Sequence, residues 1–114
     1  MCCLFGILDY GHKLSRKEKT QILSVLSVAC EERGTDATGI AYNSGGSLKV
    51  YKRPLPAHLL WFKVYEDTNL VMGHTRMTTQ GSERFNQNNH PFSGQVGCTN
   101  FALAHNGVLN NDKR

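Results

Sequence analysis

Two strand-like segments joined by a glycine-rich connection constrain the fold of this chain more than any other feature. Residues 38–42 and 48–52 contain the β-branched and aromatic residues that strands favour. Their connection, residues 43–47 (Asn-Ser-Gly-Gly-Ser), is a strong hairpin signal, although five residues allow several turn geometries. The sequence therefore predicts a β-hairpin near the middle of the chain.

A strand and a helix are predicted before this hairpin. Residues 2–8 are continuously apolar and lead into a polar turn, as in a buried strand. Ser15 and Glu18 form a capping box, and apolar residues then recur at helical spacing. Gly34 predicts the end of this helix.

The second half of the chain gives more varied signals. Residues 69–74 and 101–105 are predicted to be strands. Residues 54–63 allow either a short helix or an apolar loop, because two prolines interrupt the preceding strand. Residues 75–97 are polar, rich in Gly, Asn and Gln, and lack a clear period, which predicts a long loop. So long a loop in a compact chain is usually functional.

Length, charge and cysteine usage exclude several classes of protein. A chain of 114 residues can form one domain with one core. The net charge is +4, but the basic residues are scattered and only residues 13–17 form a cluster, so we expect a solvated helix start and no nucleic-acid partner. No apolar run approaches the roughly 20 residues that span a bilayer, so we expect no membrane segment. The four cysteines lack the spacing of a disulfide framework and no signal peptide precedes them, which predicts a cytoplasmic protein with reduced thiols.

Cys2 directly follows the initiator methionine and is the first candidate for catalysis. Methionine aminopeptidases remove Met1 before a small residue, which leaves a thiol and a free α-amine on one residue. The amine has a reference pKa of roughly 7.7 to 8.0, so it can take a proton from the thiol near neutral pH. The resulting thiolate can attack amides or esters.

Three other interpretations of Cys2 compete with catalysis by its own amine. Free cysteine is among the most buried residue types, so Cys2 can be an ordinary core residue of the first strand. Cys2 and Cys3 together can be S-acylation sites, but no polybasic patch or amphipathic anchor accompanies them. A Cys–His dyad would leave the N-terminal position of Cys2 unexplained.

Five short motifs in a fixed order decide between these interpretations. They are Cys2, residues 33–39 (Arg-Gly-Thr-Asp-Ala-Thr-Gly), 73–81 (Gly-His-Thr-Arg-Met-Thr-Thr-Gln-Gly), 88–92 (Asn-Asn-His-Pro-Phe) and 105–107 (His-Asn-Gly). In this order and at these intervals, the chain resembles the class II glutamine amidotransferases, which are N-terminal-nucleophile enzymes. This family hydrolyses glutamine and passes the ammonia to a synthase partner.

The resemblance implies roles for the reacting centre. Cys2 would be the nucleophile that attacks the glutamine side-chain amide, with its α-amine as base. Asn106 and Gly107 would hold the oxyanion through the Asn amide and the Gly backbone N–H, since amide cleavage needs fixed donors beside the developing charge. An Asn-Gly pair after a strand is also a common hairpin turn, and both interpretations can hold together.

The resemblance also implies substrate-binding and supporting residues. Arg76 would hold the α-carboxylate of glutamine, for which the planar guanidinium is better suited than an ammonium group. His74 and Thr79 would lie near the bound glutamine. Arg33 would support the nucleophile, and Asp36 would mainly organise the backbone. No metal site is expected, because His74, His90 and His105 belong to these motifs and lack the spacing of zinc ligands.

Three positions differ from the family pattern. Cys3 stands where the best-known members have glycine, which places a second thiol beside the nucleophile. Met77 and Gln80 stand where the sugar-synthesising branch has tryptophan and histidine. These two residues point away from that branch, so the ammonia acceptor cannot be assigned by analogy with it.

The resemblance implies an α+β fold, the αββα sandwich of two antiparallel sheets between helical layers. The glutaminase domain of the family is roughly twice as long, so residues 1–114 would be its N-terminal portion, with only the first half of the sandwich present. The missing half normally supplies several strands and an acidic residue that binds the glutamine α-amino group. One face of a sheet would then be uncovered.

The expected function is hydrolysis of glutamine to glutamate and ammonia through a thioester on Cys2. L-glutamine would be the substrate, no cofactor is expected, and a synthase domain or subunit would accept the ammonia. Two alternatives stay open: an N-terminal-nucleophile hydrolase of γ-glutamyl peptides or other amides, and a non-catalytic fragment or glutamine-binding module. The acceptor and the oligomeric state are not determined by the sequence.

Overall fold

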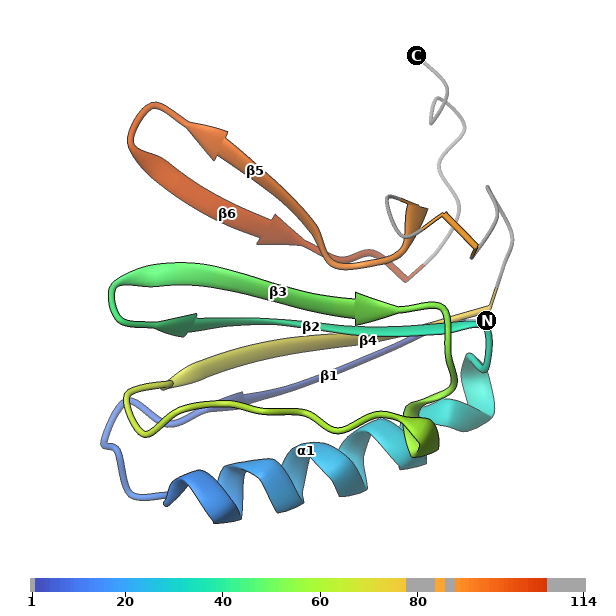
Figure 1. Ribbon diagram of the computed structural model, residues 1–114, viewed down its shortest axis with the longest axis horizontal. Coiled ribbons are helices and arrows are strands. Elements are labelled where there is room, and N and C mark those ends of the chain that lie inside the picture. Colours follow the sequence, from blue (N-terminus) through green and yellow to red (C-terminus); the bar gives the residue numbers. More distant parts are fainter. Residues whose placement is uncertain (1, 78–83, 86–87, 107–114) are drawn as a thin grey trace.

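A computed structural model describes residues 2–77, 84–85 and 88–106 of the chain (Figure 1). Helices and strands alternate irregularly along these residues, with strands in the majority. The elements in chain order are β1 (Cys3–Leu8), α1 (Arg16–Cys30), the 3₁₀ helix η1 (Glu31–Arg33), β2 (Ala37–Ser44), β3 (Ser47–Arg53), the 3₁₀ helix η2 (Ala57–Leu59), β4 (Leu70–Arg76), β5 (Phe92–Val96) and β6 (Thr99–Leu103).

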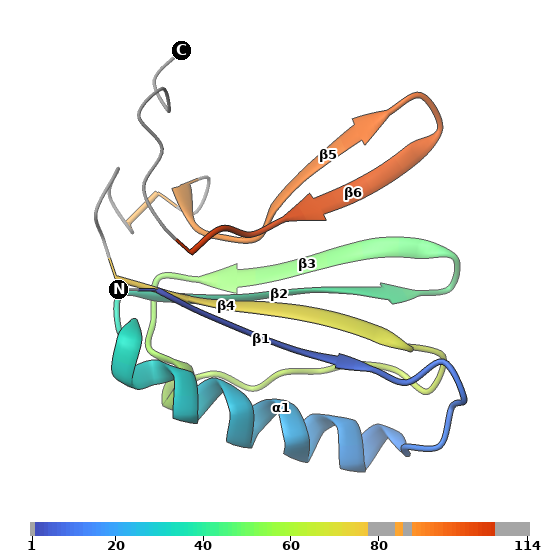
Figure 2. The same cartoon turned by 180° about the vertical axis from the view of Figure 1, so that it is seen from behind.

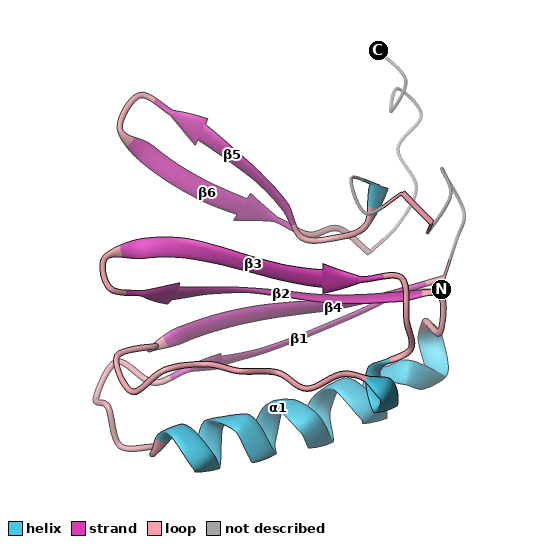
Figure 3. Cartoon of the chain, in the orientation of Figure 1, coloured by secondary structure: helices cyan, strands magenta, loops and turns pink. Residues whose placement is uncertain are grey.

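Three layers are stacked in the described part of the chain. Four strands form an antiparallel sheet in the order β1-β4-β2-β3, and β5 pairs with β6 in a separate hairpin. Helix α1 lies across one face of the sheet and the β5–β6 hairpin lies over the other face (Figures 1 and 2). Helix and strand are therefore segregated into separate layers (Figure 3). This arrangement confirms the predicted α+β class and is consistent with part of an αββα sandwich.

Helix α1 begins where the sequence predicts. The Ser15 hydroxyl accepts a hydrogen bond from the Glu18 backbone N–H at 3.1 Å, and the Glu18 carboxylate accepts one from the Ser15 N–H at 3.0 Å. This capping box satisfies two backbone donors at the helix start. The hydrogen bond from the Ser15 backbone N–H, followed by the influence of the Ser15 side chain, lowers the pKa of the Glu18 carboxyl. After Cys30 the helix tightens into η1 and ends at Gly34, as predicted.

The central hairpin is present, but its turn is shorter than predicted. Strands β2 and β3 continue until Ser44 pairs with Ser47, so only Gly45 and Gly46 form the turn. Both glycines have positive φ angles, 59° and 74°, which the hairpin twist requires and glycine adopts without strain. The Asp67 side chain accepts hydrogen bonds from the Ser44 hydroxyl and the Gly45 N–H and so fastens the turn.

The prediction of one loop over residues 75–97 is wrong at both ends. Strand β4 continues to Arg76, because Thr75 and Arg76 pair with β2. Strand β5 begins at Phe92 and pairs with β6, which itself starts two residues earlier than predicted. Most β5 side chains are exposed and Gly94 lies at the centre of the strand, so the sequence lacks the apolar alternation that would reveal it.

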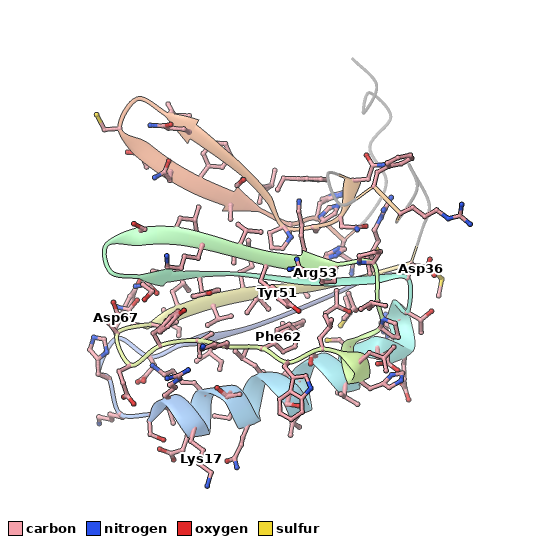
Figure 4. The ribbon with its side chains drawn as sticks, in the orientation of Figure 1. Lys17, Asp36, Tyr51, Arg53, Phe62 and Asp67 are labelled. Atoms are coloured by element: carbon pink, nitrogen blue, oxygen red, sulfur yellow. The ribbon has the colours of Figure 1, made fainter. Side chains whose placement is uncertain are left out.

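The hydrophobic core lies between α1 and the four-stranded sheet. Its buried members are Leu23, Ile40, Phe62, Val64 and Val71. The Phe62 ring lies 6.4 Å from the Phe5 ring and 6.4 Å from the Tyr51 ring, centroid to centroid, in the space between sheet and helix (Figure 4). Residues 54–63, for which a short helix or an apolar loop is predicted, therefore contain both: the short helix η2 and, after it, a loop that contributes Phe62 to the core.

Lys19 joins α1 to the loop that precedes β4. Its side chain is fully buried, and its ammonium group donates to the carbonyl oxygens of Tyr65, Glu66 and Thr68 at 2.8, 3.0 and 2.8 Å. Three acceptors match the three N–H donors of an ammonium group. The Lys19 ammonium group thereby gives hydrogen-bond donors to three carbonyls of this loop that have no partner in a strand.

We expect Lys19→Met to lower the free energy of unfolding by about 3 kcal/mol, because methionine fills the volume but leaves the buried carbonyls without donors. Urea denaturation of the purified chain measures this change. The matched control is Lys17→Met on the same helix, where the side chain is exposed and points away from the sheet (Figure 4), and there we expect a change within about 0.5 kcal/mol. Equal effects of the two substitutions would contradict a specific role for Lys19.

Candidate active site

Strand register gathers three of the sequence motifs at one end of the four-stranded sheet. In β1, Cys3 pairs with Thr75, and in β2, Ala37 pairs with Arg76. Cys2 and Asp36 each precede a paired residue, so both lie at this end of the sheet. The backbone N–H of Asp36 donates to the Arg76 carbonyl oxygen at 2.9 Å. The N-terminal motif, the Arg-Gly-Thr-Asp motif and the Gly-His-Thr-Arg motif therefore meet here.

Gly34 is required at this position because the backbone of β4 passes very close to it. A Cβ atom added to Gly34 would lie 2.6 Å from the backbone nitrogen of Arg76 and 2.6 Å from the carbonyl carbon of Thr75. Its own backbone is extended, with φ at −167°, so the constraint is steric. The glycine allows the segment after η1 to pack against the strand that carries Arg76.

Cys2 is buried, with 8% of its surface exposed. It lies one residue before β1, so the strand begins one residue later than predicted. The Sγ atom lies 3.7 Å from the carbonyl oxygen of Met77, at the end of β4. The thiol is thus held near the strand end that carries Arg76.

Arg76 is almost completely buried, with 4% of its surface exposed. Its Nη1 atom donates a hydrogen bond to Oδ1 of Asn89 at 2.8 Å. Asn89 is itself fully buried and was not among the residues predicted for the site. The only indication in the sequence is that Asn89 belongs to the motif at residues 88–92. This membership does not reveal that Asn89 orients the arginine.

Lys52 on β3 holds the segment that carries Asn89. Its ammonium group donates to the carbonyl oxygens of Asn89 and Pro91 at 2.7 and 3.0 Å and lies 5.4 Å from the centre of the Phe92 ring. Burial lowers the pKa of Lys52. Gly39 makes room for this segment, since a Cβ there would overlap the His90 carbonyl oxygen. Neither role was predicted, because both depend on contacts between distant parts of the chain.

Two stacked histidines fill the space between the sheet and the hairpin beside Arg76. The rings of His74 and His90 lie 4.1 Å apart and are nearly parallel. His74 Nε2 lies 3.1 Å from the His105 carbonyl oxygen, which can only accept, so Nε2 carries the proton. His90 Nδ1 accepts from the backbone N–H of His105 at 3.0 Å, so this nitrogen is unprotonated.

Both histidines are neutral at neutral pH. Burial lowers the pKa of His74 to about 4, and the nearby charge of Arg76 acts in the same direction. Burial, followed by the charges of its neighbours, lowers the pKa of His90 to about 3. His74 Nδ1 has no hydrogen-bond partner within the described residues. The described residues contain no group of three or more His, Cys, Asp or Glu side chains arranged to hold a metal ion.

The other predicted site residues are placed less closely or lie outside the described part. Arg33 is an exposed residue at the end of η1, and Asn106 is exposed in a bend after β6. Thr79 and Gly107 lie outside the described residues. Among the predicted residues, the structure thus brings together Cys2, His74, Arg76 and the backbone of Asp36.

Comparison with known proteins identifies relatives of the chain. It is 40% identical over 81 residues to a glutamine–fructose-6-phosphate aminotransferase (isomerizing) of Halobacterium salinarum. The aligned residues cover 71% of the chain and 13% of that protein. It is 33% identical over 109 residues to the enzyme of the same name from Caldanaerobacter subterraneus, covering 93% of the chain and 17% of the relative. It is also 28% identical over 120 residues to human amidophosphoribosyltransferase, covering 99% of the chain and 23% of the relative.

The chain is therefore a homologue of the class II glutamine amidotransferases, the family to which both kinds of relative belong. It spans about a fifth or less of the length of most of these relatives. No family model matches the sequence, and no solved structure matches it significantly. Because the relatives include both glutamine–fructose-6-phosphate aminotransferases and amidophosphoribosyltransferases, the expectation that Met77 and Gln80 point away from the sugar-synthesising branch stays a prediction.

No helix in the described part of the chain is long and apolar enough to cross a membrane.

The neutral histidines predict loss of stability in mild acid. Between pH 6.5 and 4 the unfolded chain protonates both imidazoles while the folded chain does not, so the free energy of unfolding falls as the pH falls. We expect a fall of roughly 5 kcal/mol over this range, about half of it from each of His74 and His90. Urea denaturation at a series of pH values measures it.

His90→Asn should flatten this pH dependence, because asparagine keeps an acceptor near the Nδ1 position but does not titrate. The matched control is His12→Asn, since His12 is exposed and its φ of 49° suits asparagine. If the control flattened the pH dependence as much as His90→Asn, the buried pair would not be its cause.

Proposed function

We propose that residues 1–114 are the N-terminal portion of a glutaminase domain that hydrolyses glutamine to glutamate and ammonia through a thioester on Cys2. The observation that carries the proposal is the register of β1, β4 and β2, which places a buried cysteine at the second position of the chain beside a buried arginine. The homology to class II glutamine amidotransferases supports the same reaction.

The proposed reaction begins after removal of Met1. The α-amine of Cys2 takes the thiol proton, and the thiolate attacks the side-chain amide carbon of glutamine. The tetrahedral oxyanion is held by the Asn106 amide and the Gly107 backbone N–H. The protonated amine returns its proton to the leaving nitrogen, ammonia departs, and water then hydrolyses the thioester to glutamate and free Cys2.

Arg76 is proposed to bind the α-carboxylate of glutamine. Its contact with Asn89 limits the rotation of the guanidinium group, which lowers the entropic cost of binding a carboxylate. The adjacent histidines are neutral and add no competing positive charge. His74 and Thr79 would line the substrate site, Arg33 would lie near the nucleophile, and Asp36 would keep Arg76 in place through its backbone hydrogen bond.

The ammonia is proposed to pass to an acceptor in a synthase domain or subunit. The relatives are named for an amino transfer to fructose 6-phosphate and for a phosphoribosyl transfer, so each of them has an acceptor. A cytoplasmic setting, with glutamine available and thiols reduced, fits the proposal.

Cys2→Ala should lower glutamine hydrolysis by at least about three orders of magnitude, because no other group supplies the thioester. Ammonia release from glutamine measures this loss. Cys98→Ser is the matched control, since Cys98 is exposed in the turn between β5 and β6 and should leave the rate unchanged. A wild-type chain without Met1 that folds but releases no ammonia would refute activity of this segment alone. Faster turnover of a γ-glutamyl dipeptide than of glutamine would favour the alternative hydrolase.

Arg76→Lys should raise the KM for glutamine by about 10- to 100-fold with a smaller change in kcat, because lysine keeps the charge but loses the paired donors. Steady-state kinetics separate the two parameters. The control is Arg53→Lys on β3, an exposed arginine that stacks on Tyr51 at 4.4 Å (Figure 4). An unchanged KM in Arg76→Lys would remove the arginine from the substrate site.

A further inference from the structure

Two cysteines lie close together on the helix-facing side of the sheet. Cys3 is the first residue of β1, and Cys30 is the last residue of α1. The Sγ atoms of Cys3 and Cys30 lie 3.7 and 3.8 Å from the same atom, the carbonyl oxygen of Leu4. The neighbouring Cys3 side chain also contributes, after burial, to a raised pKa of the Cys30 thiol. Both are partly exposed, so a small reagent can reach them.

The backbone around this pair is fixed from a third element. Cys3 pairs with Thr75 in the sheet, and the Thr75 hydroxyl donates to the carbonyl oxygen of Cys30 at 2.9 Å. The end of the helix is therefore attached to the residue that lies directly beside Cys3. A disulfide requires the two backbones to be close, and this attachment supplies that proximity without any partner chain.

The two thiols differ in their readiness to react. Burial and, after it, the neighbouring Cys3 side chain raise the pKa of Cys30 to about 12, while Arg33 lowers it slightly. Cys30 therefore stays protonated at neutral pH, with its thiol directed at the carbonyl oxygen of Leu4. Because the thiolate is the nucleophile, the first attack on an electrophilic sulfur falls to Cys3.

We propose that Cys3 and Cys30 are a redox site that forms a reversible disulfide with low-molecular-weight disulfides such as oxidised glutathione. The Cys3 thiolate attacks one sulfur of the reagent, and a mixed disulfide forms as one thiolate leaves. Cys30 then loses its proton to solvent, and its thiolate attacks the Cys3 sulfur and displaces the second thiolate. Two protein thiols are oxidised and one reagent disulfide is reduced to two thiols.

The disulfide would join the start of β1 to the end of α1 and leave Cys2 available. Side chains alternate along an extended segment, so Cys2 and Cys3 point to opposite sides of the sheet. The link would also restrict the unfolded chain between residues 3 and 30, which should stabilise the folded state. These consequences do not depend on the proposed glutaminase reaction.

The test is titration of the purified full chain with oxidised and reduced glutathione at fixed ratios, followed by rapid acid quenching. Peptide mapping under non-reducing conditions then identifies each linked pair, and alkylation identifies each free thiol. We expect a Cys3–Cys30 link as the main product, with Cys2 and Cys98 alkylated, and a melting temperature several degrees higher than that of the reduced chain. Added dithiothreitol should reverse both changes.

Cys3→Ser and Cys30→Ser should each abolish the link, whereas Cys98→Ser should leave it unchanged. In Cys30→Ser, the mixed disulfide on Cys3 should accumulate because the second thiol is missing. Separate glutathione adducts on Cys3 and Cys30 of the wild-type chain, with no link at any ratio, would overturn the proposal. A main product linked through Cys2 or Cys98 would overturn it as well. The wild-type result decides the question even if one variant fails to fold.

Discussion

The antiparallel register of β1, β4 and β2 is the constraint on which the other features of the structure depend. It sets Cys3 against Thr75 and Arg76 against Ala37, which brings residues far apart in sequence to one end of the sheet. A shift of one residue in β4 would turn His74 and Arg76 toward the core side and Thr75 toward the hairpin. Such a shift would bury a charged guanidinium among Leu23 and Phe62, so the register is strongly specified by the free energy of burial.

Two lysines, the fully buried Lys19 and the half-buried Lys52, hold the outer layers against this sheet through hydrogen bonds to backbone carbonyls. Lys19 on the helix side donates to three backbone carbonyls of the loop before β4. Lys52 on the hairpin side donates to two carbonyls of the segment before β5. In each case an irregular segment has carbonyls without strand partners, and the ammonium group supplies the donors. The position of Asn89, and through it the orientation of Arg76, depends on the second of these contacts.

The features that could be predicted from sequence are those fixed by neighbouring residues. The capping box of Ser15 and Glu18 marked the helix start, and Gly45-Gly46 marked the central turn, because each motif acts over a few positions. The roles of Asn89 and Lys52 could not be predicted, since they depend on contacts across 13 to 39 positions. The pairing of β5 with β6 is local, but β5 lacks the apolar alternation that would reveal it. Resemblance to a family named Cys2 and Arg76 as site residues, and the register places both at one end of the sheet, while their roles stay predictions.

The hairpin layer covers the sheet unevenly, and this bears on why the candidate site lies where it does. Near residues 89–92 the hairpin reaches the sheet, where the His74 and His90 rings stack, and toward its turn it diverges from the sheet (Figures 1 and 2). At the far end Leu8 is 63% exposed and Leu70 is 46% exposed. In a sandwich of two sheets, these leucines lie where a second sheet packs. The hairpin closes over the end of the sheet that holds Cys2 and Arg76, so the burial of these two residues rests on contacts made within the described residues. The opposite end of the sheet is left open and supplies apolar surface for further packing.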